Sequence, residues 1–235
     1  MGTAWPPFAK SRLTSTVSTI RLADGIYTLV SEFVVDAAGA TVVGGREAVV
    51  QCANLGSSFH VKNGRTLTLR GFVLERGVEC TNATLSMVGL SFDHPTAKEI
   101  RSWVSSTDCS TSITDSQFIG SLQHGITASE GSLTVTGTRV EGSAGHGIVC
   151  TTATCSITTS RIIGNQLVGV DATPIALELG RSVLTENVQG GVRTIGGTCD
   201  ITNNFVFRNG NDADGTFGGM RLEPSAGGSH RIEHN

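Results

Sequence analysis

Charged and aromatic side chains are scarce in this chain of 235 residues. Only 16% of the residues are Asp, Glu, Lys or Arg, and 5% are aromatic. The formal net charge is −3, and no basic run or basic stripe with interleaved aromatic residues occurs. Proteins that bind nucleic acid neutralise phosphates with clustered Lys and Arg. We therefore expect no nucleic-acid partner.

Long apolar runs and long helix-forming segments are missing as well. No stretch approaches the roughly 20 apolar residues that span a bilayer, so we expect no membrane span. Residues 1–10 lack the apolar core and cleavage site of a signal peptide, so either the chain is cytosolic or a signal was removed, and we favour removal partly because of the cysteines. Proline is rare, at 5 residues, whereas glycine reaches 30 and Thr, Ser, Val and Ile are abundant. This composition favours strands and tight turns and predicts an all-β fold.

A repeat of 22 residues runs through the second half of the chain. An apolar anchor recurs, with a second apolar residue five positions later and a Gly-aliphatic pair beginning twelve positions later. The anchors are Ile113, Val135, Ile157, Leu179 and Ile201. Their partners are Phe118, Val140, Ile162, Leu184 and Val206. The glycines are Gly125, Gly147, Gly169 and Gly191, and Gly219 continues the series after an insertion.

The residue types inside each repeat identify the architecture. Leucine-rich repeats have a similar length, but they need a dense leucine pattern that is absent here. Short β-branched bursts between Gly, Ser and Asn instead predict a right-handed, single-stranded parallel β-helix with three strands per coil. Two polar positions recur with the same period and support this interpretation, because stacked coils bring equivalent residues to about 4.8 Å. They are occupied by Ser116, Thr138, Ser160, Ser182 and Asn204, and by Ser121, Ser143, Asn165, Asn187 and Asn209.

The first half of the chain is less regular. We take Leu67 with Phe72, and Leu85 with Leu90, as earlier anchors with their partners. Val42 and Ile20 are further candidate anchors, which gives about nine coils in total.

Two early segments carry a family resemblance. Residues 20–29 (IRLADGIYTL) and 65–72 (RTLTLRGF), with the later Asn and Gly-Ile coils, resemble pectate-lyase-like parallel β-helix proteins. The resemblance covers most of residues 20–235. That superfamily includes lyases, hydrolases, epimerases, phage tailspikes and non-catalytic surface proteins, so the resemblance implies the fold and leaves several functions open. The Pro-x-x-Arg element of pectate lyases and a set of stacked calcium aspartates are not found.

The two ends of the chain lead to separate expectations. We expect residues 1–19 to be an N-terminal cap or an added segment, with Trp5 and Phe8 covering the first coil, because a solenoid must protect its end coils. Residues 20–235 then form the β-helix. Residues 229–235 look like the start of another coil with Ile232 as anchor, so we expect a solenoid that is truncated at this end.

Six cysteines are present, an even number that suits disulfides. Cys80 and Cys109 lie at nearly the same phase of successive coils, and Cys150 and Cys155 flank a short turn. We predict these two bridges and no bridge between Cys155 and Cys199, which lie two coils apart. Buried free thiols are the alternative. Disulfides favour a secreted or cell-surface protein.

One outward-facing file of residues is the first candidate site. If the aliphatic residue after each glycine points inward, the next residue points outward. In related proteins the substrate lies along an outer sheet, and here Asp171, Arg193, Arg221 and Glu223 would form a charged patch on consecutive coils. Arg side chains bind carboxylates, so a uronic-acid polymer would suit the patch. The alternative is a salt-bridge ladder that only stabilises this face.

Two further candidates carry ionisable groups. His124 and His146 are 22 residues apart and could do acid–base work, although they also suit a turn without a special role. Asp212 and Asp214 lie in an insertion that resembles half of a calcium loop but lacks the later Glu, so calcium is the candidate cofactor and a solvated turn is the alternative.

The sequence supports two classes of function. We expect an extracellular β-helix module that binds polysaccharide or serves as a surface structure. The alternative is a polysaccharide lyase, epimerase or glycoside hydrolase that acts on an acidic glycan, and the sequence alone does not decide whether the protein is an enzyme.

Overall fold

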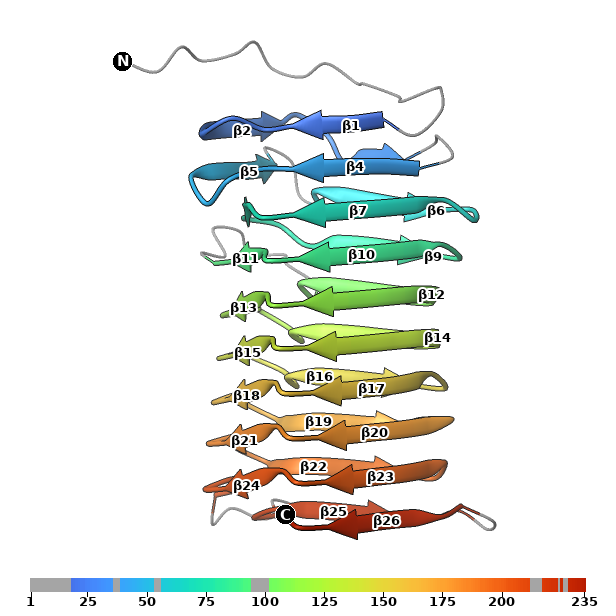
Figure 1. The fold of residues 1–235 in the computed structure, drawn as a ribbon. Coiled ribbons are helices and arrows are strands. Elements are labelled where there is room, and N and C mark those ends of the chain that lie inside the picture. Colours follow the sequence, from blue (N-terminus) through green and yellow to red (C-terminus); the bar gives the residue numbers. More distant parts are fainter. Residues whose placement is uncertain are drawn as a thin grey trace.

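The structure is a computed structural model, and it describes residues 18–35, 39–52, 56–93, 102–211, 217–223, 225 and 228–235. All regular elements in these segments are strands, and every pairing between them is parallel. Within these segments no helix is long and apolar enough to cross a membrane. The strands stack into a column in which those facing the viewer run to the left and those behind run to the right as the chain descends (Figure 1). The column is therefore a right-handed parallel β-helix.

Each coil contributes one strand to each of three sheets. The first sheet contains β1 (Ser18–Arg21), β4 (Gly39–Val43), β7 (Thr66–Arg70), β10 (Thr84–Val88), β17 (Thr154–Thr158), β20 (Ala176–Gly180), β23 (Thr198–Thr202) and β26 (His230–Glu233). The second contains β2 (Gly25–Leu29), β5 (Ala48–Cys52), β8 (Val73–Leu74), β11 (Ser91–Phe92), β13 (Gln117–Ile119), β15 (Arg139–Glu141), β18 (Arg161–Ile163), β21 (Val183–Thr185) and β24 (Phe205–Phe207). The third contains β3 (Phe33–Val35), β6 (Phe59–Lys62), β9 (Val78–Thr81), β16 (Ile148–Thr151), β19 (Val168–Thr173), β22 (Gly190–Ile195) and β25 (Met220–Glu223).

Two long strands join the third sheet to the first. β12 (Val104–Thr114) pairs with β9 through its first half and with β10 through its second half. β14 (Ile126–Thr136) does the same with β16 and β17. The chain turns this corner through residues with positive φ, which are Asp108 in β12 and Glu130 with Gly131 in β14. The nine strands of the second sheet agree with the expected nine coils.

The predicted files of apolar residues are confirmed in register. The anchors pair in order from Ile113 to Ile201, and the second file pairs in order from Phe118 to Val206. Phe118 through Leu184 are completely buried, and Val206 packs partly buried against the core from the last strand of the second sheet. Burial of these files supplies the hydrophobic stabilisation of the solenoid.

Two of the earlier anchors, Leu67 and Leu85, were placed two residues too early, whereas Val42 and Ile20 lie in register with Leu69. The structure pairs Leu69 with Met87, and Met87 with Ile113, so Leu67 and Leu85 occupy the preceding inward position. Side chains in a strand alternate with a period of two, so residues i and i+2 both face the core and the apolar pattern alone cannot separate them.

The recurring glycines are explained by close approach at a corner of the coil. A Cβ added to Gly147 would lie 2.6 Å from the backbone oxygen of Gly169, and Gly169 meets Gly191 in the same way at 2.7 Å. Any side chain here would therefore push successive coils apart.

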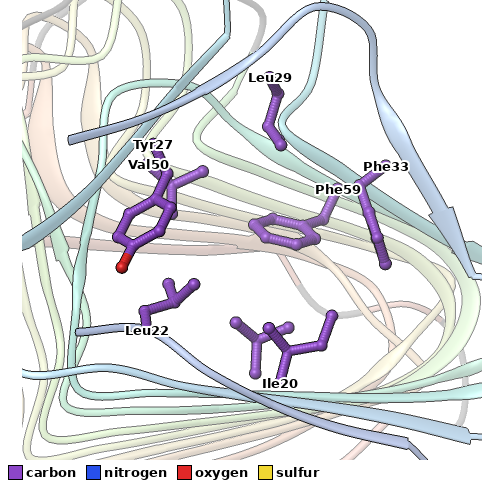
Figure 2. Close-up of a pocket in the computed structure, with 8 residues that line it drawn as sticks. Ile20, Leu22, Tyr27, Leu29, Phe33, Val50 and Phe59 are labelled. Atoms are coloured by element: carbon purple, nitrogen blue, oxygen red, sulfur yellow. The ribbon is translucent and has the colours of Figure 1, made fainter. Parts of the chain in front are cut away.

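The N-terminal end of the core opens into an apolar cavity of about 50 Å³ (Figure 2). Its walls come from the first coil and from the coils that follow it. The lining residues of the first coil are half-buried, and those of the following coils are buried. The lining residues are Ile20, Leu22, Tyr27, Leu29, Phe33, Val42, Val50 and Phe59. The first described coil thus leaves part of its apolar face without cover from the described residues.

Candidate functional site

The outward file of the third sheet lies where the repeat predicts it. Val149, Asp171, Arg193 and Arg221 are in register on β16, β19, β22 and β25, directly beside one another. Val170 and Val192, which precede Asp171 and Arg193, are completely buried. The aliphatic residue therefore fixes the inward direction and turns its neighbour to the outer face.

Asp171 and Arg193 form a two-pronged ion pair across adjacent coils. Arg193 donates from Nε to Oδ1 at 2.7 Å and from NH2 to Oδ2 at 2.6 Å. The side chains are 15% and 34% exposed, respectively, so the pair is only partly screened by water. This hydrogen bonding raises the pKa of Arg193 above its ordinary value, against the opposing effect of burial.

Arg221 and Glu223 form a second, separate pair within β25. Nε of Arg221 lies 2.7 Å from Oε1 of Glu223, and the side chains are 56% and 42% exposed. Residues i and i+2 of a strand share a face, which explains the contact. The four predicted residues therefore occupy one face but divide into two ion pairs. Two carboxylates balance two guanidinium groups, so the patch carries no net charge.

The two predicted histidines stack beside this file. The ring centroids of His124 and His146 are 5.2 Å apart with an interplanar angle of 19°. Nδ1 of His124 accepts a hydrogen bond from the backbone N–H of His146, and Nδ1 of His146 accepts one from the N–H of Val168. A neutral imidazole that accepts at Nδ1 carries its proton on Nε2. Both rings are thereby fixed in the same tautomer when neutral.

The His146 ring joins the histidines to the charged file. Its Nε2 lies 3.4 Å from Oδ2 of Asp171. Burial lowers the pKa of His146 below the ordinary 6.5, and Asp171 opposes this effect. Burial lowers the pKa of His124 in the same way. The histidine pair and the charged file were predicted as separate candidate sites, and the structure brings them together into a single row, His124–His146–Asp171–Arg193.

The spacing explains why the link was missed. Asp171 follows His146 by 25 residues, which is one 22-residue coil plus three residues, so the contact is diagonal. A search limited to equivalent positions in successive coils finds each file but not the contact between them. A search at one period plus or minus three residues would have found it.

The contacts assign different chemical capacities to the two rings. Both nitrogens of His146 face partners, and the carboxylate of Asp171 is shared between Arg193 and His146. Among the described residues, Nε2 of His124 has no hydrogen-bond partner. The ring of His124 packs against Gly145, where an added Cβ would lie 2.5 Å from Nδ1. His124 is therefore the member of the row whose Nε2–H is best placed to donate a hydrogen bond to a bound molecule.

The predicted calcium ligands Asp212 and Asp214 lie outside the described residues, so they are not assigned to the site.

Comparison with known proteins gives a likeness in fold. No protein-family model and no curated protein sequence matches the chain. Among solved structures, the crystal structure of the pectate lyase Pel9A superposes with a TM-score of 0.57 over 90% of this chain and 69% of that chain, at 14% identity. At this identity the likeness shows the pectate-lyase-like parallel β-helix fold alone.

Proposed function

We propose that this protein is an extracellular β-helix module that binds an acidic polysaccharide along the outer face of its third sheet. The observation that carries the proposal is the pair of arginines, Arg193 and Arg221, at equivalent outward positions of adjacent coils. Their separation is one strand spacing, about 4.8 Å, and both side chains remain partly exposed. A guanidinium group binds carboxylates through a planar fork, so two in file suit a polymer that carries repeated carboxylates.

The ion pairs shape this binding surface. Asp171 holds Arg193 through Nε and NH2, which fixes the plane of the guanidinium before a ligand arrives. Glu223 contacts Nε of Arg221, and more than half of the Arg221 side chain stays exposed. Preorganised cationic groups lose less side-chain entropy on binding. The structural neighbour is a pectate lyase, which supports an acidic polysaccharide as the ligand class.

Two disulfides support the extracellular part of the proposal. Cys80 is bonded to Cys109 and Cys150 to Cys155, as predicted. Such bonds persist in oxidising compartments and are rare in the cytosol of mesophiles.

A matched pair of variants tests the binding surface. Arg231 on β26 contacts Glu233 two residues on, just as Arg221 contacts Glu223, and is similarly exposed at 59%. We expect Arg221→Ala to weaken binding of polygalacturonate about tenfold, or about 1.4 kcal/mol, as measured by isothermal titration calorimetry at low salt. Arg231→Ala, on the first sheet, should leave binding unchanged. Equal affinities of all three proteins, or no binding by the parent, would favour a purely structural role for the ion pairs.

The histidine row favours a second candidate function, catalysis on the same polymer as a lyase, epimerase or hydrolase. In the tautomer set by its Nδ1 contact, His124 carries its proton on Nε2, which has no hydrogen-bond partner among the described residues. This N–H can donate a hydrogen bond to a substrate oxygen that gains negative charge during the reaction. Incubation with polygalacturonate, followed by ultraviolet detection of unsaturated products and by reducing-end analysis, tests this alternative. A His124→Asn variant that retains full activity would argue against it.

A further inference from the structure

A second group of ionisable side chains lies on the same sheet, at the N-terminal end of the solenoid. One ligand atom each from Glu32, His60 and Glu79 lies within 4.8 Å of the corresponding atoms of the other two. Nδ1 of His60 is 3.5 Å from Oε2 of Glu32. All three side chains are half-buried, so they are partly withdrawn from water but remain accessible to a small ion.

The solenoid itself brings the three residues together. β3, β6 and β9 stack in register, so that Val34 pairs with His60 and His60 with Glu79. His60 and Glu79 are therefore neighbours in one outward file. Glu32 stands two residues before Val34, on the same outer side of the first coil. The cluster thus spans three consecutive coils.

We infer that Glu32, His60 and Glu79 form a binding site for a divalent first-row transition-metal ion, with Zn²⁺ as the best match. One imidazole and two carboxylates are a ligand set of three, which leaves a position for water or another ligand. Two carboxylates also neutralise the charge of a divalent ion. Ca²⁺ and Mg²⁺ fit less well, because they select oxygen ligands and an imidazole nitrogen does not suit them.

The distances are close to those that the ion requires. Tetrahedral Zn²⁺ with ligand bonds of about 2.1 Å holds neighbouring ligand atoms about 3.4 Å apart. The Nδ1 to Oε2 distance of 3.5 Å between His60 and Glu32 already matches this value. The widest separation, at most 4.8 Å, must close by about 1.4 Å, which rotation of a glutamate side chain provides.

Outer contacts orient two of the three ligands. Nε2 of His60 lies 3.3 Å from the hydroxyl oxygen of Thr81. This oxygen can accept a hydrogen bond from Nε2–H when Nδ1 binds the metal. The hydroxyl of Ser57 donates to Oε1 of Glu79 at 2.9 Å and so restricts the orientation of that carboxylate. Partners of this kind fix the tautomer and the plane of metal ligands.

The ion would link the first three coils across the outer surface. Since these coils lie beside the open apolar end of the core, the bound ion would stabilise the end of the solenoid. An ion that binds only the folded protein raises its stability in proportion to the logarithm of ion concentration over Kd. Zn²⁺ should therefore raise the melting temperature of the protein as well as bind to it.

The test uses the whole chain after treatment with a chelator and removal of the chelator. We expect calorimetric titration with ZnCl₂ to show one ion per chain, with CaCl₂ and MgCl₂ binding at least about tenfold more weakly. His60→Gln and Glu79→Gln should each weaken Zn²⁺ binding more than about tenfold. Circular dichroism of both variants checks that they fold. If His60→Gln does not fold, Glu79→Gln still tests the site.

Two controls separate this site from other histidine and cysteine side chains that could bind the ion. His146→Asn, in the histidine row, should leave Zn²⁺ affinity unchanged. With Co²⁺ as probe, the absorption spectrum should show weak visible bands. An intense near-ultraviolet band should be absent, because such a band would report Co²⁺ bound to the free thiols Cys52 and Cys199. Absence of Zn²⁺ binding, loss of binding in His146→Asn, a thiolate band, or unchanged affinity in both His60→Gln and Glu79→Gln would each overturn the inference.

Discussion

Nδ1 of His124 accepts a hydrogen bond of 3.0 Å from the backbone N–H of His146, one coil further along the solenoid. His146 repeats the arrangement with the N–H of Val168 at 3.1 Å. An imidazole here takes the place that a backbone carbonyl would hold in a regular ladder. Protonation at Nδ1 would abolish the acceptor, so each of these bonds is made by the neutral ring.

The protein should lose stability on mild acidification. Burial lowers the pKa of both histidines in the folded state, so the unfolded chain binds protons first as the pH falls. The contribution of the neutral rings is fully present above the unfolded pKa of about 6.5 and is lost progressively as the pH falls below it. Chemical denaturation between about pH 7.5 and pH 5 should show this decline.

A substitution that keeps the acceptor identifies the groups responsible. The amide oxygen of His146→Asn can replace Nδ1 but does not titrate, so this variant should flatten the decline. His234→Asn, at an exposed position, should leave the pH profile unchanged. A His146→Asn profile that follows the parent would assign the decline to other groups.

The asparagine ladder should be a main source of stability. The side chain of Asn187 accepts from the backbone and the amide of Asn165, and donates to Asn209 and to the carbonyl of Ile162. Asn187→Leu would leave buried polar groups unpaired, and we expect a loss of about 2–4 kcal/mol in the free energy of unfolding. Gln166→Leu, on the exposed surface nearby, should change it by less than about 0.5 kcal/mol. Urea denaturation of both variants measures the difference. Equal losses in the two variants would show that the asparagine ladder is not a main source of stability.

The two disulfides should differ in their contribution. The Cys80–Cys109 bond closes 29 residues and the Cys150–Cys155 bond only 5. On the loop-entropy account, the first contributes about 3.6 kcal/mol and the second about 2 kcal/mol. Paired Cys→Ala variants should lower the melting temperature in this order. Mass spectrometry of the unreduced parent should find two free thiols, at Cys52 and Cys199, and six free thiols would exclude both bonds.

The apolar cavity at the N-terminal end gives a test of the proposed cap. Trp5 and Phe8 lie outside the described residues. We propose that residues 1–19 cover the cavity through these two side chains, because Ile20, Tyr27 and Phe33 line an apolar opening there (Figure 2). The double variant Trp5→Ala, Phe8→Ala should lower the melting temperature and increase binding of an apolar dye. The sequence contains two tryptophans, so in a Trp103→Phe background acrylamide quenching reports Trp5 alone. Quenching as strong as that of free tryptophan would refute the cap.

The fold was predictable because each coil repeats the same physical requirements. The inward files from Ile113 and from Phe118, the outward position of Asp171, and both disulfides follow from the spacing of residue types. The register of the coils that contain Leu67 and Leu85 was not predictable, because Leu67 and Leu69 both face inward and the early coils vary in length. Side-chain contacts that cross between files, such as His146 with Asp171, depend on side-chain direction, which the repeat does not specify. The cluster of Glu32, His60 and Glu79 was not predicted, because it lies in the irregular early coils and because its contacts depend on side-chain direction.

Each coil adds a constant length along the axis of the solenoid. Each step along the outward file from His60 to Arg221 advances about 4.8 Å along the axis, whatever the length of the turns between strands. Inserting one whole 22-residue coil between the N-terminal cluster and the arginines would lengthen their separation by one such step and leave every side chain facing as before. Deleting a single strand residue would instead turn part of the file inward. A linear ligand could therefore be matched to this surface by adding or removing complete coils.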